Sequence, residues 1–596
     1  MNSRSKRLFS GSSLLFPTLA MFLMVSMCAH ALVILSGPAL ILTPSAPLAA
    51  TLQVTTDVDS RVSVSVRDGT NTWQRNFYNY SKSNTVPLLG FKAGRTNEIT
   101  VTLHDRYRNG LTNFAPLLLV TAPLPSDFPK PVLLASNPDK MEPGYTLFRI
   151  VNNDKNKAYL AIVDNAGEVV WYSGVGSILD VRQLSNGDLF LPLTSSFSEI
   201  NMLGQTVKSW IVPPGLAVNQ HDGVPTDHGT ILYLNDASRL VTNFPTSATN
   251  PHARLSTTNV IYNRVIEISA TNAALLKTWS PIDMLNPTRI NYLSFTIRNS
   301  MGWDCEHANA VIEDPRDDSL IVSMRHQDAV IKFTRTGQLK WILSPHENWG
   351  AAFQPYLLNP VGTPFQWNYA QHAPMITPQG TLLIYDDGNF RASPFDPTVP
   401  DAKNYTRAVE YAIDEQTMEI TQVWEYGRTN GEPLFTDRVG NADWLPQSGN
   451  VLITFGNVDY VNGLHPSPYS TNATMLRIKE VTHDAVPEVV FDLAFFDYTN
   501  KSPTYKGCFA YRSHRIPDLY SVLPKAVTDL TVEADSGMAT LQFSGDGART
   551  YIIEASTNLL QWDEIGFGES VGDGNFEFDD ENSIGAPARY YRVVTQ

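Results

Sequence analysis

The sequence predicts an all-β protein: a six-bladed β-propeller, preceded by a β-sandwich and followed by a small fibronectin type III-like sandwich. Helical periodicity is almost absent, and short apolar strands with turn residues between them recur along the chain. From about residue 140 to 520 these strands form a weak internal repeat, which is typical of a propeller. With 43% hydrophobic residues among 596, the chain has enough apolar surface for a large core.

The N-terminus has the pattern of an export signal. A basic segment at residues 4–7 precedes an apolar run over residues 14–27, and residues 29–31 (Ala-His-Ala) form a small-x-small cleavage site. We therefore expect residues 1–31 to be a signal peptide, with small residues also allowing a cut as late as residue 50. An uncleaved membrane anchor is the alternative. Cleavage predicts a periplasmic or secreted protein with no stable membrane span.

Residues 52–122 are expected to form the N-terminal β-sandwich. Period-2 runs such as residues 62–66 (VSVSV) and 99–103 (ITVTL) place apolar side chains on one face of a strand. The segment that follows, residues 122–131 (APLPSDFPKP), contains four prolines and is predicted to be a linker.

Residues 132–525 are expected to form the propeller. One half of each repeat ends in an apolar strand that closes on an aromatic residue, at Trp171, Trp210, Trp279, Trp341, Trp424 and Phe491. The other half is a turn followed by an apolar strand, such as residues 380–385 (GTLLIY). Residues 526–596 alternate again in an acidic, Gly-rich context and form the C-terminal sandwich, which is expected to contact a surface or a glycan.

The formal charge of −15 argues against a nucleic-acid partner, so an anionic substrate needs a local positive site. After signal cleavage the chain retains Cys305 and Cys508, which are too few for a disulfide framework or a multi-cysteine metal site. Whether these two cysteines pair is left open by the sequence, and so is a homodimer.

Histidines recur at one position of the repeat. His221 lies eight residues before Gly229, and His372 lies eight residues before Gly380, in register without a gap. His307 begins the same half-repeat, with three extra residues in its turn. Because equivalent strand starts in a propeller meet at one end of the axis, we expect these three imidazoles to lie together.

Two further side chains are predicted to join them. Arg325 ends the antiparallel strand that returns to His307, and Asn309, two residues from His307, projects to the same side. His228 and His326 do not match the register and are expected to be structural or supporting residues. Four other histidines are expected in loops: His346, His465, His483 and His514.

This set suits two kinds of chemistry. Three histidines could bind zinc and leave a fourth position open for water. They could equally hold an oxyanion, with one imidazole as nucleophile. Arg325 and Asn309 favour the oxyanion, because a guanidinium is repelled by a metal cation but fits the oxygens of a sulfate or phosphate. No metal is therefore expected.

The motifs also carry a family resemblance. The chain resembles the bacterial 3′-phosphoadenylyl-sulfate-independent arylsulfate sulfotransferases from about residue 52 to 525. The likeness is densest in HANAV…DDSLIVSMRHQDAVIKF…GQLKWIL, which begins at His307, and in NYAQHAPMITPQGTLLIYDDGNFR (368–391).

The resemblance implies an exported propeller enzyme that transfers a sulfuryl group in two steps. His372 would be the nucleophile that forms a transient sulfohistidine, and an acceptor phenol would then take the group. His221, His307, Asn309 and Arg325 would surround the sulfuryl oxygens, with one histidine shuttling the phenolic proton. The donor would be a phenolic sulfate ester. No cofactor is expected, and no Gly-rich nucleotide loop of the dinucleotide or Walker type is present.

Other functions stay open at this point. A sulfatase or phosphatase could pass the same intermediate to water, a zinc-dependent hydrolase could use the histidines as ligands, and a non-catalytic propeller could bind ligands on its face. Loop aromatics are compatible either with phenol stacking or with loop packing: Phe353, Tyr356, Phe365 and Trp367.

Overall fold

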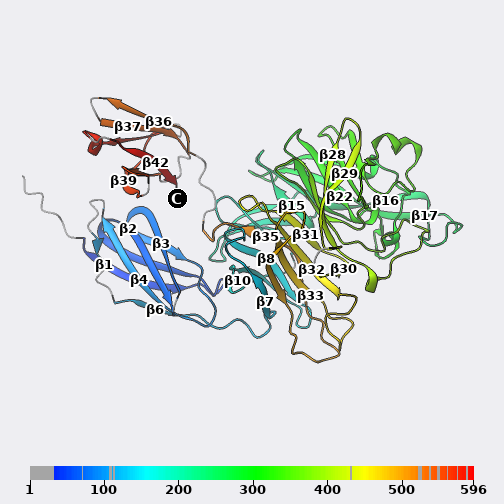
Figure 1. Ribbon diagram of the computed structural model, residues 1–596, viewed down its shortest axis with the longest axis horizontal. Coiled ribbons are helices and arrows are strands. Elements are labelled where there is room, and N and C mark those ends of the chain that lie inside the picture. Colours follow the sequence, from blue (N-terminus) through cyan, green and yellow to red (C-terminus); the bar gives the residue numbers. More distant parts are fainter. Residues whose placement is uncertain are drawn as a thin grey trace, which may run out of the picture.

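The computed structural model shows an all-β chain whose helices are short 3₁₀ turns (Figure 1). It describes residues 32–595 except 70, 106–109, 112–114, 177, 430–431, 521–526, 536–537, 546–550, 560, 573–574 and 586–587. The signal peptide predicted at residues 1–31 and the predicted boundary at 525/526 lie outside the described residues. The 3₁₀ helices are η1 (Pro281–Asp283), η2 (Tyr292–Phe295), η3 (Arg325–Gln327), η4 (Ala351–Tyr356), η5 (Asp401–Lys403) and η6 (Glu581–Ser583).

The N-terminal strands form one six-stranded antiparallel sheet, drawn in blue in Figure 1. Its strands are β1 (Ile34–Leu42), β2 (Ala50–Asp68), β3 (Asn71–Leu88), β4 (Thr96–Asp105), β5 (Gly110–Leu111) and β6 (Leu117–Val120). Alternate residues of β2 are buried, as the period-2 pattern predicted. The sheet begins at Ile34, ahead of the boundary expected at residue 52, because β1 pairs with the first half of β2.

Residues 131–516 form six further sheets, a propeller-like arrangement. The first contains β8 (Tyr145–Asn152), β9 (Lys157–Val163), β10 (Val169–Gly174) and β35 (Cys508–Ile516). The second contains β11 (Arg182–Gln183), β12 (Leu189–Pro192), β13 (Ser196–Ile200) and β14 (Thr206–Ile211). The third contains β15 (Asn219–Pro225), β16 (Thr230–Phe244), β17 (Ser256–Ser269), β18 (Leu275–Trp279), β19 (Arg298–Asn299) and β20 (Gly302–Asp304).

Three more sheets complete this region. The fourth contains β21 (Ala308–Asp314), β22 (Ser319–Met324), β23 (Ala329–Phe333) and β24 (Leu339–Leu343). The fifth contains β25 (Asn359–Pro360), β26 (His372–Ile376), β27 (Leu382–Asp386), β28 (Arg407–Asp414) and β29 (Glu419–Tyr426). The sixth contains β30 (Leu434–Thr436), β31 (Gly440–Trp444), β32 (Val451–Val461), β33 (Met475–Val481), β34 (Val489–Phe495) and β7 (Pro131–Ser136).

The two ends of this region complete its first and last sheets. β35 pairs with β8, so the last strand along the chain becomes part of the first sheet. β7 pairs with β34, so the first strand becomes part of the last sheet. The predicted linker therefore ends where Pro131 opens β7. These two pairings join chain segments that are far apart in sequence.

The repeated aromatic residues occupy equivalent places. Each of the six sheets carries one of them on a strand at or next to its edge, and all six side chains are buried: Trp171, Trp210, Trp279, Trp341, Trp424 and Phe491. The aromatic repeat seen in the sequence therefore marks one strand in every sheet.

The C-terminal strands form two sheets, coloured orange to red in Figure 1. One contains β36 (Thr528–Asp535), β37 (Met538–Ser544), β41 (Asn575–Asp580) and β40 (Glu569–Gly572). The other contains β39 (Asp563–Phe567), β38 (Tyr551–Ser556) and β42 (Tyr590–Thr595). An ion pair of 3.0 Å joins Arg61 of the N-terminal sheet to Glu564 of β39.

Both cysteines of the described chain are free and buried, which answers the question that the sequence left open. The Cys305 Sγ donates to the carbonyl of Ile261, and the Cys508 Sγ donates to that of Phe495. The two thiols therefore belong to separate parts of the core.

Replacing Trp171 by alanine should lower the free energy of unfolding by about 3–5 kcal/mol. Its side chain is fully buried, and its Nε1 donates to the Met202 carbonyl at 2.7 Å. Denaturant unfolding measures the change. Val486→Ala is the control, because Val486 is 79% exposed and its loss should change stability by less than about 0.5 kcal/mol. Equal stability of the two variants would contradict the expectation.

Candidate active site

The structure brings together the three histidines that the repeat register predicted. His221 lies on β15, His372 opens β26, and His307 immediately precedes β21. The ring centroids of His221 and His307 are 4.7 Å apart. Tyr511 of β35 lies beside this group, with its ring 5.7 Å from that of His221 and 6.3 Å from that of His372.

The backbone around these histidines is unusual. His307 has a φ of 48°, and Ala370 and Ala373 on either side of His372 have φ values of 53° and 47°. Non-glycine residues rarely adopt this left-handed conformation, which costs about 1–3 kcal/mol and is concentrated at functional sites. The strain therefore coincides with the predicted site.

His307 is held by an acidic residue that the sequence analysis did not single out. Its Nδ1 lies 2.6 Å from Asp304 Oδ2, and its ring stacks on that of His326 at 4.5 Å. Burial by itself would raise the pKa of Asp304, but the hydrogen bond and charge of His307 lower it to about 2. Asp304 is therefore ionised and accepts the Nδ1 proton of His307.

His372 has a similar partner. Its Nδ1 lies 2.5 Å from Asp387 Oδ2, and both side chains are almost fully buried. Burial lowers the pKa of His372 well below its usual value, and the charge of Arg325 lowers it further. His372 is therefore neutral near pH 7, which leaves it able to act as a nucleophile.

His221 is anchored by an amide instead of a carboxylate. Its Nδ1 contacts Asn219 Oδ1. Burial, followed by the neighbouring charge of His307, lowers the pKa of His221 well below its usual value. All three histidines thus use Nδ1 for a side-chain oxygen, and Nε2 is the ring atom that this contact leaves available.

Arg325 lies in η3 next to these rings. Its Nη2 donates to the Asp437 carbonyl at 2.6 Å, and its Nη1 lies 3.0 Å from His326 Nε2. Its Nε is buried, and no described residue hydrogen-bonds to it. Burial lowers the pKa of Arg325, and none of its hydrogen bonds within the described chain goes to a carboxylate. Its charge is therefore available to an anion.

Asn309 is fully buried, and its Nδ2 donates to the Gln371 carbonyl at 2.8 Å. Its Oδ1 has no hydrogen-bond partner among the residues that the structure describes. A register shift between Ala308 and Ala310 interrupts the strand alternation that predicted a shared face with His307. The amide links the strand of His307 to the residue before His372.

His326, expected to be a supporting residue, lies between His307 and Arg325, and its Nδ1 donates to the Asp304 carbonyl. His514 corrects the prediction of a loop position, because it lies within β35. The other three loop histidines lie outside the strands: His346, His465 and His483. The loop aromatics pack against core clusters, which supports loop packing over phenol stacking: Phe353, Tyr356, Phe365 and Trp367.

β35 adds two site residues that sequence reasoning missed. Tyr511 Oη and Arg512 Nη2 both donate to the Asn309 carbonyl, at 3.2 and 2.8 Å. The sequence of this strand, CFAYRSHRI, carries several charged residues, and most of the strand is nevertheless buried. Those charged residues were the only signal in the sequence. Nothing local indicates that this strand lies beside the histidines.

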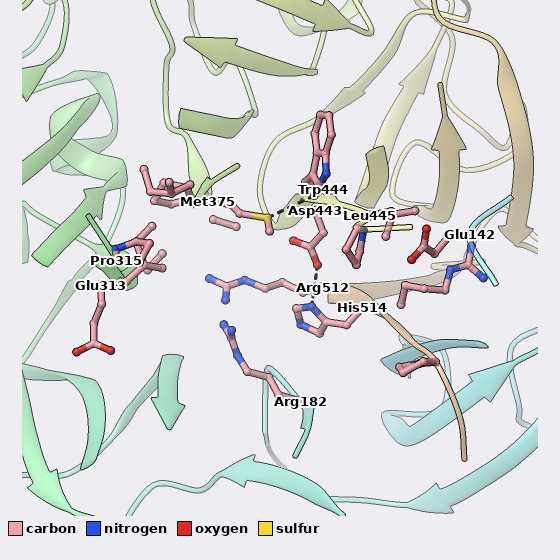
Figure 2. Close-up of a pocket in the computed structure, with 18 of the residues that line it drawn as sticks. Glu142, Arg182, Glu313, Pro315, Met375, Asp443, Trp444, Leu445, Arg512 and His514 are labelled. Atoms are coloured by element: carbon pink, nitrogen blue, oxygen red, sulfur yellow. Dashed lines mark hydrogen bonds and ion pairs between the residues drawn. The ribbon is translucent and has the colours of Figure 1, made fainter. Parts of the chain in front are cut away.

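A pocket of about 610 Å³ lies beside Arg512 (Figure 2). Arg182, Arg512 and His514 approach it with their cationic groups. Carboxylates match them: Asp222 Oδ1 accepts from Arg182 at 2.9 Å and from Arg512 at 3.2 Å, and His514 bridges Asp443 and Asp180. These charged side chains of the pocket are therefore paired with one another, whereas Arg325 hydrogen-bonds to no carboxylate of the described chain.

Two groups of side chains within the described chain could hold a metal ion. Asp304, His307 and His326 have ligand atoms within 4.8 Å of one another, but Arg325 Nη1 occupies His326 Nε2. His228, Glu313 and Asp318 form the second group on the surface, where Arg335 contacts both carboxylates. Neither group is the His221, His307 and His372 set considered for zinc.

Comparison with known proteins identifies related sequences. The family model Arylsulfotransferase (ASST) matches residues 125–506. An arylsulfate sulfotransferase AssT of Escherichia coli is 25% identical over 379 residues, and one of Lelliottia amnigena is 24% identical. Each alignment covers 54% of this chain, which spans 61% of the relatives' length. A Bacteroides caccae structure of unknown function is 13% identical, covering 62% of this chain and 98% of that one, with a TM-score of 0.34.

The stability of the protein should fall as the pH rises through about 9. Burial alone would lower the pKa of His514, but Asp180 and Asp443 raise it from 6.5 to about 9. A group whose pKa is higher in the folded state stabilises fully below pH 6.5 and loses that effect above about 9.

This shift corresponds to roughly 3 kcal/mol. Thermal unfolding from pH 6 to 10 should show the loss in the wild type and not in His514→Gln. Parallel profiles for the two proteins would contradict the assignment to His514.

Proposed function

Because the chain belongs to the arylsulfotransferase (ASST) family, we propose that it transfers a sulfuryl group from a phenolic sulfate ester to an acceptor phenol. The observation that carries the proposal is the convergence of His221, His307 and His372 beside Arg325, whose charge has no carboxylate partner among its hydrogen bonds. A buried guanidinium that hydrogen-bonds to no carboxylate of the described chain, next to the neutral imidazoles of His221 and His372, suits a small oxyanion.

In the first step the Nε2 lone pair of His372 attacks the sulfur of the ester. The N–S bond forms while the S–O bond to the phenol breaks, and the phenolate leaves with the bonding electrons. Arg325 and the Asn309 amide stabilise the sulfuryl oxygens, where charge is spread in the transition state. No nucleotide donor takes part.

In the second step the acceptor phenol attacks the same sulfur from the vacated side. Its proton passes to a histidine, for which His307 is the best placed, since ionised Asp304 stabilises the imidazolium that forms. The N–S bond breaks, and its electrons return to His372 Nε2. Dividing one displacement into two gives ping-pong kinetics. His221 contacts His307 and completes the wall of the site.

Passage of the sulfuryl group to water instead of a phenol would make the protein a sulfatase, and the balance depends on how well the site excludes water. A phosphatase, a zinc-dependent hydrolase and a non-catalytic propeller remain outcomes of the test. We also propose that the six sheets are the blades of a propeller around one axis. The C-terminal module is proposed to be fibronectin type III-like and to contact a surface or a glycan. Whether two copies form a homodimer is left open.

We further propose that the protein is exported to the periplasm or beyond, on the evidence of the apolar segment at residues 14–27. Within the described residues no helix has the length and apolarity that a membrane crossing requires. A cut after residue 31 suits the fold better than one near residue 50. The later cut would remove β1 together with Leu48 and Ala49, which are buried in the core.

The function is tested with an aryl sulfate donor, with and without a phenol acceptor, in the presence of a chelator. We expect the donor phenol to be released in an acceptor-dependent way, and we expect His372→Ala to lose at least about 1000-fold in rate, since it removes the nucleophile.

Several results would redirect the assignment. Release without acceptor would indicate a sulfatase, loss of activity with chelator would indicate a metal site, and full activity of His372→Ala would exclude this nucleophile. Arg325→Met, similar in length but uncharged, is the matched variant for charge and should raise KM and lower kcat together.

The N-terminus of the protein recovered from the periplasm or medium should begin at residue 32. Mass spectrometry of the intact chain measures it. A chain that begins near residue 50 should be less stable, because β2 would lose the pairing of β1 along its first half. Recovery of a stable chain beginning near residue 50 would contradict the role given to β1.

A further inference from the structure

Two consecutive aspartates at the end of β27 have different partners: Asp386 is its last residue, and Asp387 follows it. Asp386 accepts hydrogen bonds from Arg407 Nε at 2.8 Å and Arg391 Nη1 at 3.0 Å. Asp387 contacts His372 Nδ1, and its Oδ1 accepts from Thr436 Oγ1 at 3.4 Å. Asp386 is therefore part of an ion-pair network in the fold, whereas the closest partner of Asp387 is the histidine.

Asp387 is fully buried, and none of its hydrogen bonds within the described chain comes from an arginine or lysine. Burying a carboxylate that receives no hydrogen bond from a cationic side chain is costly, and the nearby charge of Arg325 offsets only part of that cost. Such groups are concentrated at functional sites.

The turn that carries Asp387 is held firmly. Gly388 has a φ of 81°, and a Cβ there would lie 2.5 Å from the Tyr405 carbonyl, so only glycine fits. Thr406 Oγ1 donates to the Asp387 carbonyl at 2.8 Å. On the other side, the left-handed residues Ala370 and Ala373 set the position of His372. Both partners of the contact are thus fixed by their backbones.

We infer that Asp387 is a positioning residue for His372. By accepting the Nδ1 proton it holds the imidazole in the tautomer whose Nε2 lone pair is free to attack sulfur. The inference rests on the proposed function, because it assigns the atom of His372 that would carry the sulfuryl group.

The same contact controls the reactivity of the intermediate. When Nε2 bonds to sulfur and Nδ1 keeps its proton, the ring carries a positive charge, which the Asp387 carboxylate stabilises. The N–S bond then breaks readily toward the acceptor, because the departing ring leaves as a neutral imidazole. A ring without the Nδ1 proton would instead leave as an imidazolate, which is a far poorer leaving group.

The pair also predicts a dependence on pH. Burial raises the pKa of Asp387 well above its usual range, although the charge of Arg325 opposes this. When the pair holds an additional proton, Nε2 is protonated and cannot attack, so activity should rise with pH as that proton leaves. Other charged and titratable groups around the pair are His221, His307, Arg512, Asp386, Tyr385, Asp437 and Asp459.

The test compares Asp387→Asn and Asp387→Ala with Asp386→Asn, the neighbouring aspartate, by measuring kcat against pH with an aryl sulfate and a phenol. We expect both Asp387 variants to lose about 10²–10⁴-fold in kcat, with little change in KM, and to lose the rise of kcat with pH. Added formate should restore part of the activity of Asp387→Ala by supplying a carboxylate to the cavity.

Asp386→Asn is expected to behave differently. It should lower the melting temperature, because Arg391 and Arg407 lose their shared partner, and it should keep the wild-type pH profile and not respond to formate. Melting curves of all variants show whether each is folded.

Other results would overturn the inference. If His372→Ala is inactive while the Asp387 variants keep the wild-type kcat and pH profile, Asp387 does not position the histidine, and the proposed function still stands. Folded but inactive Asp387 variants whose pH profile is unchanged and which formate does not rescue would overturn it as well. Activity in His372→Ala would instead refute the proposed nucleophile.

Discussion

The arrangement of the inner strands depends on Arg512. It comes from the last strand of the propeller-like region, and its guanidinium contacts Asp180, Asp222 and the Asn309 carbonyl, which belong to three other parts of the chain. Asp222 in turn accepts the Val311 amide at 2.9 Å. Losing one partner of such a buried network leaves uncompensated charge, at a cost of about 3–5 kcal/mol. Arg512 thereby fixes how β35, β15 and β21 meet.

This network divides the interior into two electrostatically different regions. On the side shown in Figure 2, carboxylates pair with Arg182, Arg512 and His514. On the histidine side, Arg325 donates to a backbone carbonyl and meets an imidazole. A bound monoanion on this side would meet a guanidinium whose hydrogen bonds in the described chain go to no carboxylate. The local charge thus opposes the net charge of −15.

The three histidines differ in the oxygen that each Nδ1 contacts: the Asn219 amide, the partly exposed Asp304 carboxylate, or the buried Asp387 carboxylate. An anchoring carboxylate stabilises positive charge on a ring, and an amide does so much less. These anchors therefore distinguish rings that the repeat makes equivalent. They give a physical reason for assigning bond formation to His372 and proton transfer to His307.

The sequence by itself predicted the all-β class, the aromatic residue in each of the six sheets, and the group of His221, His307, His372 and Arg325. All of these follow from local periodicity and from the register of a repeat, which neighbouring residues determine. The sequence did not single out Asp304, Asp387, Tyr511 or Arg512, and it placed His514 in a loop. Asp304 and Asp387 contact their histidines over 3 and 15 residues of chain, at positions that the repeat register does not mark. Tyr511, Arg512 and His514 take their places because β35 completes the first sheet. The pairing of β35 with β8 and of β7 with β34 is decided by long-range packing, and no periodicity within a short stretch of chain predicts it.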